Sequence, residues 1–369
     1  MTGSTAGVES RTIDQATAPT PPQPLTPTAT VAVIGALAAA VAAVLALRSL
    51  ADMLGDRAVW VTLLLLVLAA LALLPLVPAG RAVAAIPRRS ALLAQGDLAR
   101  SRHQSAVGRE HAHTALGYAL AIVLCGGLIW FTTTNDGAIT RTFLRAEFLR
   151  ASLEDVTVAF WVNIKVAVGA QGLVLVVGLV LAVLRLLPGR AGRPLRWLSI
   201  AYVDTFRAIP SIIVLYLVGF GLKLAQVPVI KDFSPIWLAI IALTLTYSAY
   251  VAEVYRAGIE SIHPSQWAAA RSLGLSYPMT LRTIIVPQAV RRIVPPLLND
   301  FIGLQKDTAL IGVMGVTDAF TQARLTSSNV FNLSPVMVVA LLFVLITIPQ
   351  ARFVDRLLSN EQRLRTGKA

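Results

Sequence analysis

The sequence predicts an all-α membrane protein whose chain crosses the bilayer about eight times. Of its 369 residues, 56% are hydrophobic and only 14% are charged. The charged residues are confined to short intervals between long apolar runs, whereas a soluble domain spreads them over its whole surface. These two observations indicate a polytopic membrane protein. The single cysteine, Cys125, excludes an intrachain disulfide and a cysteine-ligated metal cluster.

The apolar runs give the candidate spans and their order. A helix needs about 20 apolar residues to cross a hydrocarbon core about 30 Å thick. The runs that meet this requirement lie at residues 29–47, 59–78, 115–133, 157–183, 198–222, 235–255, 296–316 and 334–354. Residues 1–28, rich in Thr, Pro and Ala, are expected to form a disordered tail, and residues 358–369 a basic tail.

Basic residues alternate between the two sides of these spans. They are concentrated in the loop at residues 81–114, in the intervals that follow the spans at 157–183 and 235–255, and in the C-terminal tail. The positive-inside rule therefore predicts a plasma-membrane protein in which these segments and both termini face the cytoplasm. This pattern also explains the net charge of +13, so nucleic acid is not expected as a partner. No metal site is predicted, because His111 and His113 are two residues apart and do not share a helix face.

Ionisable residues at membrane depth distinguish the two halves of the chain. The first three spans, within residues 29–134, are almost pure Ala, Leu and Val, whereas residues 155–357 carry polar groups inside the spans. Charged side chains in the bilayer are costly and normally face a cavity or a partner. Function is therefore expected in residues 155–357. The candidates for a translocation path or a permease–permease interface are Lys165, Glu253, Asn299, Lys306 and Asp307.

Structural explanations compete with the functional one at these positions. Lys306 and Asp307 are sequence neighbours whose side chains point apart on a helix, so each needs a partner elsewhere, and a buried structural pair is the alternative to a path. Lys165 either meets a substrate carboxylate or extends to the outer interface. Spacing of three residues favours local ion pairs between Glu253 and Arg256 and between Asp204 and Arg207.

The stretch EVYRAGIESIHPSQWAAARSLGLSYPMTLRTIIVP, Glu253 to Pro287, is amphipathic and basic. His263-Pro264-Ser265 is a helix start signal, Gly274 ends that helix, and a second helix begins near Ser276. Trp267, Ala270 and either Leu273 or Gly274 share one face, so an aromatic anchor beside small residues is available to a groove on a partner. The alternative is an amphipathic hairpin that lies on the bilayer.

The same stretch resembles the coupling motif in permease subunits of ATP-binding-cassette importers. That motif reads EAA, three residues, G, nine residues, I, one residue, LP, and the matching positions here are Ala268-Ala269-Ala270, Gly274, Ile284 and Val286-Pro287. The polar amino acid uptake subfamily is more similar still, through YVDTFRAIP (Tyr202–Pro210), AYVAEVYRAGIESI (Ala249–Ile262) and NDFIGLQKDTALIGVMGV (Asn299–Val316). The chain departs from the pattern at Ala268, where the family has glutamate, and at Ala208-Ile209, where it has glycine before proline. The resemblance covers about residues 155–357.

This resemblance implies a five-helix permease core at residues 155–357, preceded by a three-helix membrane extension at 29–134. It implies that the residues at the ATPase contact are Trp267, Ala268, Ala269, Ala270, Arg271, Leu273, Gly274 and Pro287. It also implies the partners: an ATPase dimer, a second permease, an extracytoplasmic binding protein and membrane lipid. The substrate would be a polar amino acid of the glutamate, glutamine, histidine or arginine class.

ATP chemistry is expected to lie outside this chain. No G-x-x-x-x-G-K-[ST] sequence is present, so ATP and Mg²⁺ would be used by the partner ATPase, and the chain is expected to be neither an enzyme nor a cofactor carrier. The alternative function is an ion-coupled secondary transporter, which also places polar residues at mid-membrane but needs no coupling helix.

Overall fold

The computed structural model describes residues 24–54, 59–187 and 189–366. Within these ranges the chain forms helices joined by short turns, with no β-strand, so the all-α prediction is confirmed. The chain divides into two compact units, residues 1–141 and residues 142–369, and each is described by itself. Most of the expected tail at residues 1–28, and the last three residues of the basic tail, lie outside the described residues.

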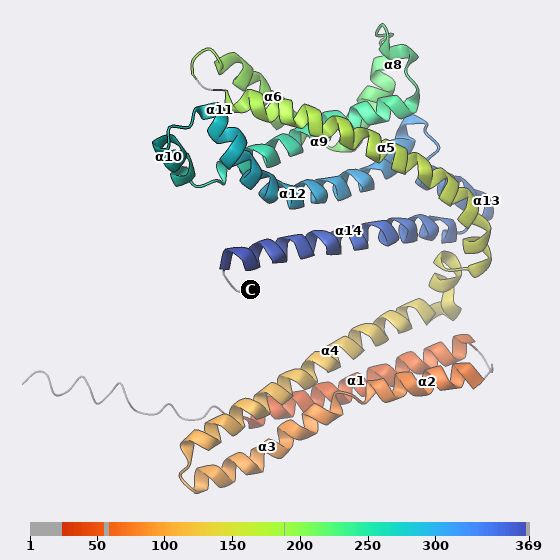
Figure 1. The fold of residues 1–369 in the computed structure, drawn as a ribbon. Helices are drawn as coiled ribbons and strands as arrows, with labels where there is room; N and C mark the ends of the chain where they lie inside the picture. Colours follow the sequence, from red (N-terminus) through yellow and green to blue (C-terminus); the bar gives the residue numbers. More distant parts are fainter. Residues whose placement is uncertain (1–23, 55–58, 188, 367–369) are drawn as a thin grey trace, which may run out of the picture. The chain divides into compact units, whose positions relative to one another are not determined.

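The first unit is a set of long helices that pack through alanine. Its helices are α1 (Thr26–Leu54), α2 (Val59–Ala72), α3 (Leu76–Ala94) and α4 (Leu98–Phe143), which lie side by side in Figure 1. The buried contact joins α1, α3 and α4 through Ala29, Ala32, Ala36, Ala79, Ala82, Ala112 and Ala115. Small side chains allow helix backbones to approach closely, which is how helices associate where lipid removes the hydrophobic driving force.

The basic segment at residues 81–114, predicted as a loop, is mostly helical. α3 continues to Ala94 and α4 begins at Leu98, so only a tight turn that contains Gly96, with φ +76°, separates them. The predicted span at 59–78 is also wrong in its bounds, because α2 ends at Ala72 and α3 starts just after Pro75. The first error arises because Ala, Arg and Leu favour helix whether or not a segment is apolar, and the second because Pro75 interrupts the apolar run.

The core of the second unit is built on α5 (Ala146–Leu186) and α9 (Pro235–Glu260). Val166 and Val174 of α5 and Leu243 and Val251 of α9 are fully buried in its main cluster. Gly178 of α5 faces Val251 so closely that a Cβ would overlap the valine side chain. Around this pair lie α12 (Val286–Asp307), α13 (Ala319–Val330) and α14 (Ser334–Thr366).

The predicted span at 198–222 is broken. α6 (Arg193–Ala208) and the helices that follow Pro210 meet at a bend of 103°. These are α7 (Ser211–Tyr216), the π-helical turn η1 (Leu217–Gly221) and α8 (Leu222–Leu224), with a short 3-10 turn η2 (Ile230–Asp232) before α9. Pro210 lacks an N–H and disfavours helical geometry at Ile209, whose ψ is 128°, so the helix ends there.

Among the described residues, five segments are long and apolar enough to cross a membrane: Thr26–Asp52, Leu65–Ala94, Leu98–Leu186, Pro235–Glu260 and Ser334–Ser359. The bent pair around Pro210 would be a sixth, and Leu98–Leu186 contains both α4 and α5. α12, which covers most of the span predicted at 296–316, is not among them because Arg291, Arg292 and Asp300 lie within it. That predicted span also ends early, since α12 gives way to a 3-10 turn, η4 (Thr308–Met314).

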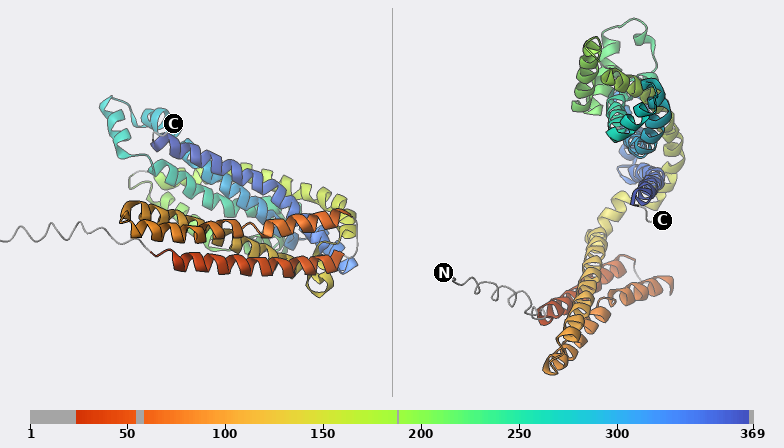
Figure 2. Two further views of the ribbon diagram at one scale, coloured as in Figure 1. Left: turned by 90° about the horizontal axis from the view of Figure 1, so that it is seen from below. Right: turned by 60° about the vertical axis from the view of Figure 1, so that its left-hand side comes forward.

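A helical hairpin projects from one end of the second unit. It consists of α10 (Pro264–Ser272), α11 (Tyr277–Thr280) and the π-helical turn η3 (Leu281–Ile285), which leads into α12. Figures 1 and 2 show α10 and α11 at the end of the unit where α5, α9 and α14 also terminate. We call α10, α11 and the joint between them the coupling hairpin.

Candidate functional site

The coupling hairpin has the helix, joint and second helix that its sequence predicts. His263 caps α10, since its Nδ1 accepts a hydrogen bond from the backbone N–H of Ser265 at 3.2 Å, and Pro264 occupies the first helical position. The helix ends in a Schellman motif: the N–H of Leu275 donates to the carbonyl of Ala270 at 3.2 Å, and the N–H of Gly274 to that of Arg271 at 2.9 Å. Gly274 has φ +77°, which only glycine adopts without strain.

Trp267 faces inward. Its ring stacks on Tyr277 with the ring centroids 5.1 Å apart, and it packs against the small cluster that includes Ile262 and Ile285. Ala270, one turn on, is also buried. Trp267 and Ala270 therefore share a face of α10, as predicted, but this face points into the hairpin. The sequence could not show this direction, because the face is covered by the residues that follow the joint at Gly274.

The outward surface of α10 consists of small and basic residues. Ala268, Ala269, Arg271 and Gly274 are exposed, and Leu273 is 79% exposed. Apart from the chain neighbours of Gly274, no described residue has an atom within 4 Å of the place where a Cβ on this glycine would be. The exposed Leu273 therefore gives this surface an apolar point beside an open glycine and the basic Arg271.

Contacts from α12 hold the hairpin to the body of the unit. The Arg292 guanidinium donates to the backbone carbonyl of Ser261 and, at 3.0 Å, to its hydroxyl, so it fixes the link between α9 and α10. Next to this link Gly258 packs directly on Ile293. Pro287 is exposed near the start of α12. The π-helical turn η3 directly precedes α12, and its wider geometry avoids a clash between the proline ring and a carbonyl of the preceding turn.

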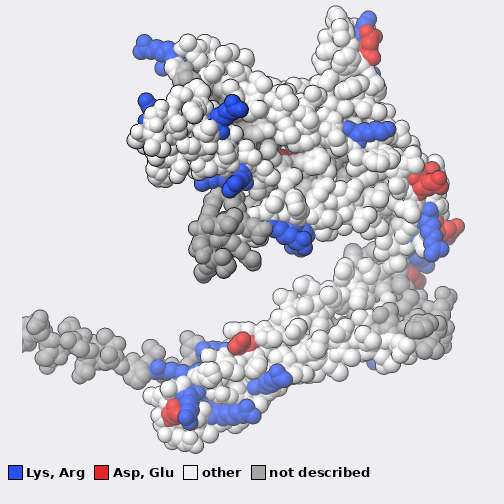
Figure 3. Space-filling model, in the orientation of Figure 1, with Lys and Arg blue, Asp and Glu red and all other residues white. Residues whose placement is uncertain are grey.

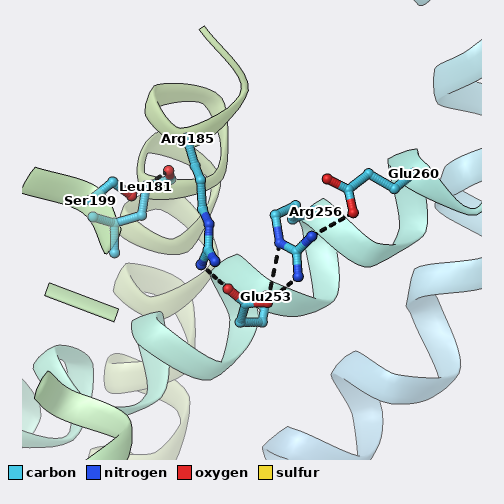
Figure 4. Close-up of polar contacts among 6 residues, drawn as sticks. All are labelled: Leu181, Arg185, Ser199, Glu253, Arg256 and Glu260. Atoms are coloured by element: carbon cyan, nitrogen blue, oxygen red, sulfur yellow. Dashed lines mark hydrogen bonds and ion pairs between the residues drawn. The ribbon is translucent and has the colours of Figure 1, made fainter. Parts of the chain in front are cut away.

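Charged residues line the same end. Glu253 accepts hydrogen bonds from Arg256 at 2.7 and 3.2 Å, which confirms the predicted local pair, and also from Arg185 at the end of α5 (Figure 4). Arg256 reaches onward to Glu260. Basic side chains also gather at this end on the surface in Figure 3. The sequence could not predict the Arg185 contact, because the two residues are 68 positions apart.

The other predicted pair is wrong. No ion pair within 4 Å joins Asp204 and Arg207 in the described part of the chain, and Asp204 is exposed. The Arg207 guanidinium lies 5.7 Å from the centroid of the Tyr250 ring on α9. Helical spacing permits a local pair, but the aromatic neighbour is available only after α6 and α9 pack.

The candidate path residues are not brought together as one cluster of contacts. Lys306 and Asp307 end α12, so they lie at a helix terminus and not inside a span; Asp307 Oδ2 accepts a hydrogen bond from the Tyr247 hydroxyl at 3.0 Å. Lys165, Asn299 and Lys306 are exposed, and their side chains make no hydrogen bond or ion pair among the described residues. Asp300, which sequence reasoning missed, has a buried Oδ2 without a hydrogen-bond partner.

A buried polar network links α5 to the turn before α13. Asn163 donates to Asp318 Oδ2 at 3.1 Å and to the Thr308 carbonyl at 3.1 Å, while its oxygen accepts from the Ala319 N–H at 3.0 Å. Asp318 is fully buried and caps α13 by accepting from Thr321. The available signal was a lone asparagine in an apolar span together with an aspartate before a helix.

The comparisons agree with these features. Residues 174–360, half of the chain, match the family model described as binding-protein-dependent transport system inner membrane component. The probable glutamine ABC transporter permease protein GlnM of Bacillus subtilis is 37% identical over 51% of this chain and 83% of its own length. The glutamate transport system permease protein GluC of Corynebacterium glutamicum is 35% identical over 54% of this chain and 90% of its own length.

A solved crystal structure of an amino acid ABC transporter with histidines is also similar. It has a TM-score of 0.50 and 28% identity, and the match covers 54% of this chain and 91% of that one. The residues that the family model matches, 174–360, lie within the second unit and include α10 and its supports, and the first unit lies outside the family model. The chain belongs to the family of binding-protein-dependent transport system inner membrane components.

Proposed function

We propose that this chain is the membrane subunit of an importer for a polar amino acid and that ATP hydrolysis in a separate subunit drives it through the coupling hairpin. The observation that carries the proposal is α10, a capped and exposed helix that ends at a glycine joint and has the residue spacing of the coupling motif. Hydrogen bonds from Arg292 to Ser261 hold the link between α9 and this helix. Docking of such a knob would pass ATPase closure to the helices behind it. The relatives are named as permease proteins of transport systems.

The proposed substrate class is supported by the relatives' names and by the polar groups of α12. The relatives' names refer to glutamine, arginine and glutamate. An amino acid carries both an ammonium and a carboxylate, and this unit offers both kinds of partner in Lys306 on one side and Asp300 and Asp307 on the other. We propose that these three residues, together with Asn299 and Lys165, line the translocation path. Glu253 would act at the end of this path that lies next to the coupling hairpin.

The proposed assembly contains two permeases, two ATPase subunits that use ATP and Mg²⁺, and an extracytoplasmic binding protein. It lies in the cytoplasmic membrane, with both termini and the hairpin in the cytoplasm, because the basic residues cluster at the α10 end. A cysteine placed at Arg190 in a variant without Cys125 tests this orientation. An impermeant thiol reagent should not reach it in sealed cells; labelling without permeabilisation would refute the orientation.

Reconstitution tests the function itself. The chain is purified with its ATPase, inserted into vesicles, and supplied with binding protein loaded with glutamine, glutamate, histidine or arginine in turn. Uptake of one of these amino acids should require ATP on the side of the vesicle membrane where the ATPase subunits lie. It should stop when ATP is replaced by a non-hydrolysable analogue. Uptake that persists without ATP but follows an ion gradient would replace this proposal with the secondary transporter.

A further inference from the structure

Four charged side chains of alternating sign form a chain of ion pairs at the α10 end of the second unit: Arg185, Glu253, Arg256 and Glu260 (Figure 4). Glu253 lies in the middle, with one carboxylate oxygen on Arg185 and the other on Arg256. The side chains of Arg185 and Glu253 are only 21% and 17% exposed. A pair withdrawn from solvent is weakly screened, and removal of one partner leaves the other charge uncompensated.

This chain of ion pairs lies where the packing of α5 on α9 ends. Further into the unit, Leu181 of α5 packs with Ala249 and Ala252 of α9, and the Leu181 carbonyl accepts from the Ser199 hydroxyl at 2.8 Å. Beyond Arg185 a cavity of about 580 Å³ separates the last residues of α5 from the coupling hairpin. Its lining residues are Val183, Leu186, Leu187, Ile259, Glu260, Ile262, Pro264, Trp267, Tyr277 and Leu281.

The cavity determines how a displacement of α10 can reach α5. Close packing transmits displacement, but a cavity has no atoms to do so. Glu260 is the last residue of α9, and α10 begins at Pro264, so the ion pairs occupy the helical turns that carry the hairpin. At this end of α5 the contact toward the hairpin is therefore electrostatic, through Arg185 and Glu253.

We propose that Arg185 is a positioning residue for energy coupling: through Glu253 and Arg256 it fastens the end of α5 to the turns of α9 that carry the coupling hairpin, so that both helices move with it. The inference rests on the proposed function and adds the route by which α5, one of the two core helices, receives the movement. Arg185 binds Glu253 through one nitrogen, Nη1, so a lysine retains the essential contact.

The test uses the reconstituted full complex with variants at Arg185, Arg190 and Glu253. Arg185→Met removes the charge at similar length, Arg185→Lys restores it, and Arg190→Met is the matched control, because Arg190 is exposed in the neighbouring turn and joins no ion pair among the described residues. Three quantities are measured: ATPase copurification, hydrolysis stimulated by loaded binding protein, and substrate moved per ATP hydrolysed.

Arg185→Met should keep the ATPase and its hydrolysis, while substrate moved per ATP falls on the order of tenfold, as expected when a coupling free energy is lost. Arg185→Lys should recover most of the ratio and Arg190→Met should match the wild type. Glu253→Gln, which keeps side-chain volume, should reproduce the loss even if the methionine variant inserts poorly.

An unchanged transport-to-hydrolysis ratio in Arg185→Met and Glu253→Gln would overturn the inference. Loss of the ATPase from these variants would overturn it too, because the pair would then belong to the docking surface. Failure of the proposed function is distinguishable, since it would appear in the unmodified chain as absent ATPase association or as transport without ATP.

Discussion

The helices of the two units of this protein pack through different kinds of side chain. In residues 1–141 the buried contact is a seam of alanines, and a buried hydroxyl such as that of Ser105 bonds to its own helix, at the Ser101 carbonyl 2.9 Å away; between helices, Ser49 of α1 and Thr133 of α4 share a hydrogen bond of 2.7 Å. In residues 142–369 branched aliphatic side chains fill the core, and buried polar groups bond from helix to helix, as Asn163 does with Asp318.

This contrast indicates where geometry is specified in a membrane protein. Alanine packing brings helices close but allows many nearly equivalent registers, because each contact resembles the next. A polar network that is satisfied in one arrangement only fixes register and angle. The unit that contains the match to the transport family has such networks, which suits the movement that the proposed function assigns to it.

The largest effect is expected at the joint of the coupling hairpin. Gly274→Asp should reduce ATPase association or stimulated hydrolysis by about tenfold or more, as loss of a central contact does, because it adds a charge to an exposed position with φ +77°. Copurification and hydrolysis in vesicles measure this. Gly274→Asn, which tolerates positive φ without the charge, should lose less, and Ala268→Glu, which restores the family's residue, should be tolerated. Wild-type stimulation by Gly274→Asp would remove α10 from the mechanism.

The second prediction compares the two units directly. Asn163→Leu should lower the stability of the second unit by about 3 kcal/mol, because it removes the hydrogen bonds to the Thr308 carbonyl and to the fully buried Asp318 and takes the acceptor from the Ala319 N–H. Ser105→Ala in the first unit removes only an intrahelical bond and should change stability by less than about 0.5 kcal/mol. Thermal unfolding of the purified protein in one detergent gives both values. Equal losses of stability in the two variants would show that buried polar groups do not distinguish the two units.

The third prediction concerns the end of α12. Lys306→Met and Asp307→Asn should each reduce uptake by about fivefold, which corresponds to about 1 kcal/mol, the typical net contribution of one hydrogen bond, while membrane insertion stays normal. Uptake per inserted protein is measured, with Lys223→Met in the segment before α9 as a control that should transport normally. If both variants at the end of α12 transport like the wild type, those charges do not line a path.

The smallest effect on transport is expected from removal of the first unit. The backbone leaves helical geometry at Thr134–Gly137 within α4, which gives a natural boundary. Deletion of residues 1–135 should leave most ATP-driven uptake, normalised to inserted protein, because neither the family match nor the coupling hairpin lies there. Complete loss of uptake in a well-folded deletion would show that the alanine-packed unit takes part in the transport cycle.

Much of the coupling hairpin could be predicted from local sequence. Pro264 at a helix start and Gly274 at its end have backbone requirements that depend on the residue itself, so the structure reproduces both. The direction of Trp267 could not be predicted, because it depends on Tyr277 in the second arm. The bend at Pro210 has a local signal, the proline itself, but the long apolar run around it led to the prediction of one continuous span.

Local sequence was enough to establish the helical class, the membrane location of the segments, the motif spacing and the pair of Glu253 with Arg256. These follow from backbone preference, from the transfer of apolar residues into lipid, and from neighbours one turn apart on a helix. Helix packing was needed to establish that Arg185 binds Glu253, that Asn163 binds Asp318, that Asp307 meets Tyr247, and that Asp300 keeps a buried oxygen unpaired. In each of these contacts the partner belongs to another element, and its distance along the chain says nothing about its distance in space until the helices have packed.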